Sequence, residues 1–164
     1  MSKNIIVIGA GPKAIALACK AKVLSESGRN GIPTITIIEK QCIGSHWDGN
    51  AGYTDGKQVL CTMPEKDLGF PYRSIFGTEI DREMLAFSWH RYLIERGYFS
   101  TWVDRGRQPP THFAFAGYLS WAAKVASANV QIGEVVKIES DRSWKITVRT
   151  NNLARPEEAV CGCI

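Results

Sequence analysis

The sequence has 164 residues, of which 45% are hydrophobic and 22% charged, and its formal net charge is +4. This composition is ordinary for a globular protein, and the length is sufficient for one domain with a hydrophobic core. No apolar run approaches the roughly 20 residues that span a bilayer. The basic residues are interspersed with acids rather than gathered into blocks. We therefore expect neither a membrane protein nor a nucleic-acid-binding protein.

The cysteines and histidines do not form a pattern that predicts a metal site. The five cysteines show no CxxC pair and no zinc-type spacing, and His90 and His112 are isolated from other metal-type ligands. The odd count argues against a disulfide framework. The first four residues lead directly into an apolar run, which leaves no room for a signal peptide. These features predict a cytoplasmic protein without a metal.

A strand, a glycine turn and a helix open the chain. The run Ile5–Ile8 is short, apolar and rich in β-branched residues, which is typical of a strand covered on both faces. Gly9 and Gly11 follow it, and an alanine-rich helical stretch continues to about Leu24. This order is that of a dinucleotide-binding βαβ unit, with Ala14 in the place of the third glycine.

Each residue type in this turn suits the binding of a dinucleotide for a physical reason. Gly9 allows a tight turn, and Gly11 lets the backbone approach a pyrophosphate. Ala14 is small enough for the helix to pack closely on the strand. Pro12 falls in the first helical turn, where its missing N–H costs nothing. The helix N-terminus then offers N–H groups and a positive dipole end to phosphates.

A second strand with an acidic end supports this interpretation. The run Ile35–Ile38 is apolar, and it ends on Glu39, whose carboxylate can accept hydrogen bonds from the hydroxyls of an adenosine ribose. The spacing exceeds the usual ~20 residues, and the polar insertion at residues 25–33 accounts for the excess. The alternative is an α/β protein with a glycine-rich turn and no cofactor.

The segment after Glu39 is long and irregular. In a doubly wound fold, the loop that follows the second strand lies over the bound nucleotide. Trp47 in this loop can cover a flavin, or it can simply anchor the loop. Residues 51–74 show neither helical nor strand periodicity, and such segments are more often functional than idle. Lys66, between Glu65 and Asp67, reads by itself as part of a solvated charge cluster.

The remaining pattern predicts helices and then a β-hairpin. Residues 81–96 carry an apolar stripe typical of one helix, residues 98–108 form a polar connector, and residues 113–126 form another helix. Residues 130–138 and 144–148 alternate as two hairpin strands. The predicted buried side chains are Met84, Phe87, Trp89, Tyr92 and Leu93 in the first helix, and Phe113, Tyr118, Trp121 and Val125 in the second. We expect an α/β, Rossmann-like fold with a βαβ start, a central parallel sheet, a helical insertion and a β-hairpin.

Four stretches together resemble the flavin-dependent N-hydroxylating monooxygenases of siderophore synthesis, and most closely lysine N6-hydroxylases of the mycobactin type. The resemblance covers roughly residues 4–150. Its most specific motif is the run from Pro64 to Ser74. The other three stretches are residues 9–14, residues 46–56, and residues 102–122 with their Trp-Val-Asp-Arg-Gly-Arg, Pro-Thr-His and Tyr-Leu-Ser-Trp-Ala segments.

The resemblance implies roles for individual residues. Lys66 matches the lysine that binds the carboxylate of the amino-acid substrate, a role that suits a flexible point charge. Many relatives carry a flavin-contacting Gln five residues earlier, where this sequence has Cys61, so a polar contact at the flavin ring is open to question there. The implied FAD-binding residues are Gly9, Gly11, Pro12, Lys13, Ala14, Glu39, Lys40, His46, Trp47 and Cys61. The resemblance gives no catalytic residue.

The implied reaction uses FAD, NADPH and O₂ to hydroxylate the terminal amine of L-lysine or, alternatively, L-ornithine. Enzymes of this family are much longer, and the sequence has no second GxGxxG that would mark an NADPH site. We therefore expect residues 1–150 to be the N-terminal part of an incomplete FAD-binding domain, inactive alone, and residues 151–164 to be a disordered or non-native tail. A non-catalytic nucleotide-binding module and an inert truncated product are the alternatives. The full-length enzymes are compatible with a homo-oligomer.

Overall fold

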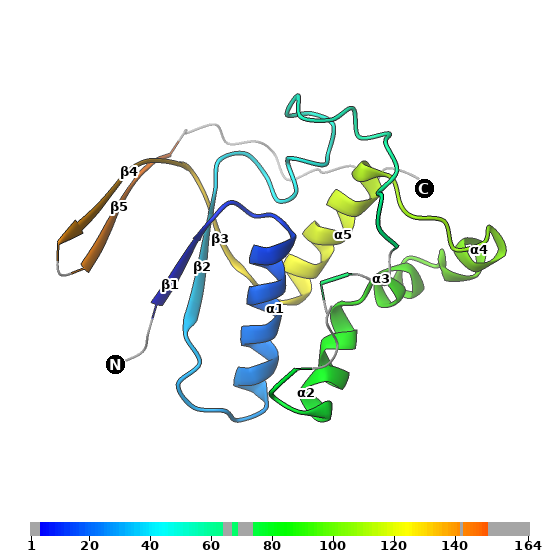
Figure 1. The fold of residues 1–164 in the computed structure, drawn as a ribbon, viewed down its shortest axis with the longest axis horizontal. Helices are drawn as coiled ribbons and strands as arrows, with labels where there is room; N and C mark the ends of the chain where they lie inside the picture. The colour runs from blue at the N-terminus through cyan, green and yellow to red at the C-terminus, as the bar shows by residue number, and fades with distance from the viewer. Residues whose placement is uncertain (1–3, 64–66, 69–73, 142, 151–164) are drawn as a thin grey trace.

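The computed structural model describes residues 4–63, 67–68, 74–141 and 143–150. The predicted tail at residues 151–164 lies outside the described residues. Strand β1 (Asn4–Ile8), helix α1 (Pro12–Glu26) and strand β2 (Thr34–Glu39) form the βαβ start. Strand β3 (Asn129–Ile132) joins the other side of β2, and the sheet has the order β1-β2-β3 with both pairs parallel. The predicted α/β class and parallel sheet are confirmed (Figure 1).

The expectation that the first strand is covered on both faces is wrong for the described residues. β2 is the middle strand and buries Ile35, Ile37 and Ile38, whereas β1 forms an edge of the sheet. The side chains of Ile6 and Ile8 are 42% and 53% exposed. An apolar β-branched run indicates a strand whose two faces can be covered, but whether other elements cover them depends on the rest of the fold.

The insertion between β2 and β3 is helical, but it is more broken than predicted. The single helix expected at residues 81–96 is three elements: helix α2 (Thr78–Glu83), a 3₁₀ helix η1 (Met84–Phe87) and helix α3 (Trp89–Glu95). Ser88 has extended backbone and caps α3 by accepting a hydrogen bond from the Arg91 N–H. Asp67 accepts a further bond from the Trp89 N–H at 2.8 Å. These two caps stabilise a new helix start inside the apolar stripe.

Two further predictions in the insertion need correction. The polar connector contains helix α4 (Phe99–Asp104), in which Trp102 donates its indole N–H to the Gln108 carbonyl at 2.9 Å. Helix α5 (His112–Val125) forms as expected and buries Tyr118 and Trp121, but Phe113 and Val125 are exposed. The expected buried set of the first stripe is confirmed for all five residues.

The core lies between α1, α3, α5 and one face of the sheet. Tyr118 is fully buried at its centre, and its hydroxyl donates to the Phe87 carbonyl at 2.6 Å. The same hydroxyl accepts the Leu68 N–H at 3.1 Å. The rings of Trp89, Tyr92 and Trp121 surround Tyr118 with centroid distances of 5.4, 5.7 and 6.0 Å. This aromatic cluster packs α3 against α5.

The strand predicted at residues 130–138 is divided between two sheets. β3 ends at Ile132, and strand β4 (Glu134–Asp141) pairs antiparallel with strand β5 (Ser143–Arg149) as the expected hairpin. Gly133 lies at the division and donates its N–H to the Glu39 carbonyl at 2.8 Å. A Cβ at Gly133 would collide with the side chain of Val148. The hairpin projects away from the helices in Figure 1.

The described part of the chain has no helix that is long and apolar enough to cross a membrane.

Candidate functional site

The glycine turn leaves the N-terminus of α1 open. Gly9 has a φ of +93° and donates its N–H to the Ile38 carbonyl at 2.8 Å. Gly11 is the N-cap of α1, Pro12 is in the first turn, and no side chain caps the helix. The first turn also has no acidic residue. Helices α3 and α5, in contrast, are capped by Ser88 and Thr111. The first N–H groups of α1 are therefore available to an anion.

The residues of this turn leave space for a phosphate. A Cβ at Gly11 would meet no atom within 4 Å, and the backbone there has a φ of −82°. Lys13 is exposed beside the turn, whereas Ala14 is buried in the core. This burial supports the predicted close packing at Ala14. The turn thus combines a backbone surface open to solvent with a tightly packed helix behind it.

Glu39 holds the glycine turn in place. Its Oε2 accepts the Ala10 N–H at 2.7 Å, and its Oε1 accepts the Gln41 N–H at 2.9 Å. The hydroxyl of Ser45 lies 3.5 Å from Oε1. The carboxylate is buried, with 8% of the residue exposed. A carboxylate oxygen has more than one lone pair, so these bonds leave acceptor capacity for a ribose hydroxyl. They also show a structural role for Glu39 that the sequence pattern did not predict.

The loop after β2 packs directly on the turn. Gly44 donates its N–H to the Ala10 carbonyl at 3.2 Å. Lys40, the next residue of the candidate set, forms an ion pair with Glu134 at 2.9 Å. This exposed pair raises the pKa of Lys40 and lowers the pKa of Glu134, through the hydrogen bond first and the charge interaction second. Lys40 therefore joins this loop to the start of β4.

The close approach at Gly44 gives a testable prediction. Gly44 has a φ of +73°, and an added Cβ would lie 3.2 Å from the backbone and side chain of Ala116 on α5. Gly52 has a similar φ of +81° but open space around it. Both alanine variants incur about 1–2 kcal/mol of left-handed strain. Gly44→Ala is expected to lose a further ~1–3 kcal/mol through overpacking, measured as a larger fall in the free energy of unfolding.

Urea denaturation of Gly44→Ala and Gly52→Ala in parallel separates strain from packing. Equal losses of stability in the two variants would show that the loop and α5 do not make this close contact.

Trp47 anchors the loop to α5. Its ring contacts His112 edge-on at 4.9 Å between centroids and Phe115 at 5.6 Å. His112 in turn shares a 2.9 Å hydrogen bond with the Thr54 hydroxyl. His46 is exposed and stacks on Tyr53 at 5.0 Å. The anchoring interpretation of Trp47 is thus supported, and a flavin contact by His46 or Trp47 stays a prediction.

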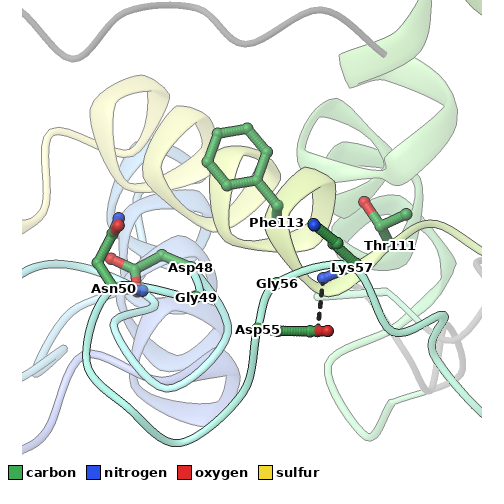
Figure 2. Close-up of a pocket in the computed structure, with 8 residues that line it drawn as sticks. All are labelled: Asp48, Gly49, Asn50, Asp55, Gly56, Lys57, Thr111 and Phe113. Atoms are coloured by element: carbon green, nitrogen blue, oxygen red, sulfur yellow. Dashed lines mark hydrogen bonds between the residues drawn. The ribbon is translucent and has the colours of Figure 1, made fainter.

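The next part of the loop accepts hydrogen bonds from the first backbone N–H groups of α5. The His112 N–H donates to the Gln58 carbonyl at 2.7 Å, and the Phe113 N–H donates to the Gly56 carbonyl at 2.9 Å. Thr111 caps the Ala114 N–H. Unlike α1, helix α5 therefore has no open N–H at these positions for an anion. Asp48, Asp55, Thr111 and Phe113 are among the residues that line a shallow cavity of about 450 Å³, and they are labelled in Figure 2.

A larger cavity of about 1320 Å³ lies between α3, α4, α5 and the loop at Cys42. Trp102, Trp121 and Arg96 are among its lining residues. Neither of these two cavities is lined by Glu39 or by the glycine turn. The sequence pattern did not indicate the larger cavity, because it depends on α4.

No contact in the described part of the structure joins the other two candidate residues, Cys61 and Lys66, to the glycine turn. Cys61 is exposed. Lys66, the candidate for substrate binding, lies outside the described residues, so its role stays a prediction. Among the described residues, no group of three or more His, Cys, Asp or Glu could hold a metal ion. Cys19 is buried in α1, as expected, and burial raises the pKa of its thiol to about 12.

Comparisons with known proteins place this arrangement in context. No family model matches the chain. The chain is 39% identical over 167 residues to the L-lysine N6-monooxygenase MbtG of Mycobacterium sp. (strain MCS), covering 99% of this chain and 39% of that protein. It is 42% identical over 142 residues to MbtG of Mycobacterium tuberculosis H37Rv, covering 84% of this chain and 33% of that protein.

A solved structure has the same fold. The lysine monooxygenase NbtG from Nocardia farcinica superposes with a TM-score of 0.85 at 39% identity, covering 89% of this chain and 39% of that chain. The chain therefore spans well under half the length of the relatives it matches.

Proposed function

We propose that this chain, which belongs to the L-lysine N6-monooxygenase family and corresponds to part of its members' length, is the FAD-binding portion of such an enzyme. The observation that supports the proposal most strongly is the uncapped N-terminus of α1 behind an open glycine turn, with Glu39 at the end of the next strand. This is the arrangement that receives a dinucleotide in doubly wound folds. The family relationship supports FAD as this dinucleotide.

The residues of the turn have distinct tasks in this proposal. Gly11 and the first N–H groups of α1 receive the pyrophosphate of FAD, and the exposed Lys13 adds positive charge nearby. Glu39 holds the turn through Ala10 and offers its remaining lone pairs to the adenosine ribose. Lys40, His46, Trp47 and Cys61 lie on the segment that follows, and in this proposal that segment lines the flavin.

Bound FAD, when reduced by NADPH, supplies the chemistry that transfers one oxygen atom of O₂ to the terminal amine of L-lysine. Lys66 is the proposed partner of the substrate carboxylate. L-lysine is favoured over L-ornithine because the relatives at 39–42% identity are named lysine monooxygenases. The structure of NbtG is described with an NADPH domain, and this sequence contains one GxG turn, which we assign to FAD. NADPH is therefore proposed to bind to a part of the enzyme that this chain does not span.

Gly11→Val is the variant that tests FAD binding. A Cβ at Gly11 would meet no atom within 4 Å, and the backbone conformation there is accessible to valine, so the fold is expected to remain intact. The valine would occupy the space of a phosphate and remove its hydrogen bonds. We expect saturable FAD binding by the wild-type chain and an affinity lower by at least about tenfold in Gly11→Val, measured by flavin fluorescence titration.

Leu17→Val, an exposed position on the same helix, is the matched control and is expected to bind FAD like the wild type. Absence of saturable binding by the folded wild-type chain would contradict the proposal that this portion forms the site. Lysine-dependent NADPH oxidation by the purified chain would contradict the assignment of the NADPH site to another part of the enzyme.

A further inference from the structure

The larger cavity, between α3, α4, α5 and the loop at Cys42, is separate from the residues proposed to hold FAD. None of those residues is among the described residues that line it. Its volume of about 1320 Å³ exceeds the roughly 300–1,000 Å³ of common small-molecule pockets. The cavity is therefore large enough for a ligand with more than one ring, and the proposed function leaves it unused.

Part of the cavity wall is formed by three aromatic side chains that contact one another. The ring of Tyr92 lies 5.3 Å from that of Trp89 and 5.4 Å from that of Trp121, measured between centroids. All three residues line the cavity. The Trp121 indole N–H donates to Glu95 at 2.9 Å, which fixes the orientation of this ring. Rings that are already fixed favour a planar ligand, because packing on them requires little further ordering.

Two cations border this aromatic wall. The Arg96 guanidinium lies 5.5 Å from the centre of the Tyr92 ring, and Lys124 follows Trp121 by three residues on α5 and so lies on the same face of that helix. Both cations line the cavity and both are exposed. Lys124 forms no ion pair with an acid in the described part of the chain. The aromatic wall therefore has positive charge beside it, which disfavours a cationic ligand.

The nearby acids do not cancel this charge. Asp48 is the one acid among the described residues that line the cavity, whereas Arg105 adds a third cation. Glu95 accepts hydrogen bonds from the Trp121 indole at 2.9 Å and from Arg91 at 2.8 Å, and these two bonds lower its pKa. The lining is therefore positive, and a ligand with an anionic group complements it.

Trp89 gives a second indication that a ligand belongs here. The residue is 3% exposed, and its indole N–H is buried without a hydrogen-bond acceptor in the described structure. Buried donors are normally paired, and an unpaired one is unfavourable. Because Trp89 lines the cavity beside Tyr92, an acceptor on a bound ligand can satisfy it.

We propose that this cavity binds a planar aromatic anion. Its rings pack on the wall formed by Trp89, Tyr92 and Trp121, and its anionic group pairs with Arg96 and Lys124. The site goes beyond the proposed function and does not depend on FAD binding, because it shares no described residue with the set proposed for FAD. A carboxylate and a phosphate both suit a guanidinium and an ammonium group, so the shared chemistry is a negative charge on a flat ring system.

Three probes with the same rings test the ligand class by calorimetry. 2-Naphthoate carries a carboxylate, 2-naphthyl phosphate carries a phosphate, and 2-naphthamide carries no charge. We expect the chain to bind at least one of the two anions saturably, with a Kd below about 1 mM. The tighter anion shows whether a carboxylate or a phosphate is preferred. 2-Naphthamide is expected to bind at least about fivefold more weakly than that anion.

Two double variants test the charged groups. Arg96→Gln with Lys124→Gln neutralises the cations beside the aromatic wall, whereas Arg82→Gln with Lys145→Gln neutralises two exposed cations that do not line the cavity. The net charge changes equally in both. We expect the first double variant to bind the preferred anion at least about tenfold more weakly and the second to bind it like the wild type. Thermal unfolding checks that both variants are folded.

The indole N–H resonances in NMR spectra show where the probe binds. We expect those of Trp89 and Trp121 to shift during the titration, and that of Trp144, which is 73% exposed on β5, to stay unchanged. Saturating FAD is expected to leave the Kd of the anion unchanged. Four results would overturn the proposal: no saturable binding of either anion by the folded chain, equal affinity for 2-naphthamide, equal losses in the two double variants, or displacement of the probe by FAD.

Discussion

Glu39→Gln is expected to weaken FAD binding by about 10–100-fold, the loss of one to two hydrogen bonds to a charged group. The carboxylate of Glu39 accepts the Ala10 N–H with one oxygen and the Gln41 N–H with the other. A glutamine side chain has the same shape but only one acceptor, and its NH₂ would face one of these N–H donors. The glycine turn would then lose one of the hydrogen bonds that hold it in place, independently of any contact between residue 39 and a ribose.

Two nucleotides distinguish the role of Glu39 in holding the turn from a role in binding the ribose. ADP carries both ribose hydroxyls, whereas 2′,3′-dideoxy-ADP carries neither, and each is titrated into the wild-type chain and into Glu39→Gln by calorimetry. If Glu39 positions the turn, the variant also binds the dideoxy nucleotide more weakly than the wild type does. Equal affinities of the two proteins for 2′,3′-dideoxy-ADP would show that Glu39 contacts only the ribose and does not position the turn.

The control for Glu39→Gln is Glu26→Gln, in the last turn of α1, where the carboxylate pairs with Lys22 at 2.8 Å. This acid is exposed and distant from the turn, so its replacement is expected to leave nucleotide affinity unchanged. The amide resonance of Ala10 gives a readout that needs no ligand. We expect it to shift and to exchange faster in Glu39→Gln, and to remain unchanged in Glu26→Gln.

Tyr118→Phe is expected to destabilise the fold by about 2–4 kcal/mol, because it leaves two buried backbone groups without their partner. The Tyr118 hydroxyl lies between the Phe87 carbonyl and the Leu68 N–H, at 2.6 and 3.1 Å. The phenyl ring itself keeps its contacts with Trp89 and Trp121. The loss therefore measures how strongly one hydroxyl joins η1, the segment at Leu68 and α5.

Thermal unfolding followed by circular dichroism measures this effect, with an expected fall of roughly 5–15 °C in Tm for a chain of this size. Tyr53→Phe is the matched control, because Tyr53 is 66% exposed and its hydroxyl has access to water. A Tm for Tyr118→Phe within 1–2 °C of the wild type, roughly what a 0.5 kcal/mol change produces, would show that the buried bridge contributes little.

Elements that depend on local chemistry were predictable from the sequence. The glycine turn with Pro12 and Ala14 follows from backbone sterics and helix-end geometry within six residues. β2 and the hairpin follow from periodicity over five to eight residues. The buried positions of α3 follow from a stripe on one helix face. Each of these patterns lies within a short stretch of consecutive residues, so it can be interpreted without knowing which distant residues it contacts.

The errors lie where a distant residue decides the outcome. The break at Ser88 is stabilised in part by Asp67, which is 21 residues earlier in the chain. The division at Gly133 of the strand predicted at residues 130–138 depends on the Glu39 carbonyl and on Val148. The exposure of Phe113 and Val125 depends on which faces of α5 the other elements cover.

The type of fold, the place of the glycine turn and the residues proposed to face a dinucleotide could all be predicted from the amino-acid sequence. The contacts of these residues could not: Glu39 accepts the Ala10 N–H, Trp47 packs on α5, and β1 forms an edge of the described sheet. The physical reason is that propensity and periodicity act along the chain, whereas hydrogen-bond partners and burial are set by groups that only the fold brings together.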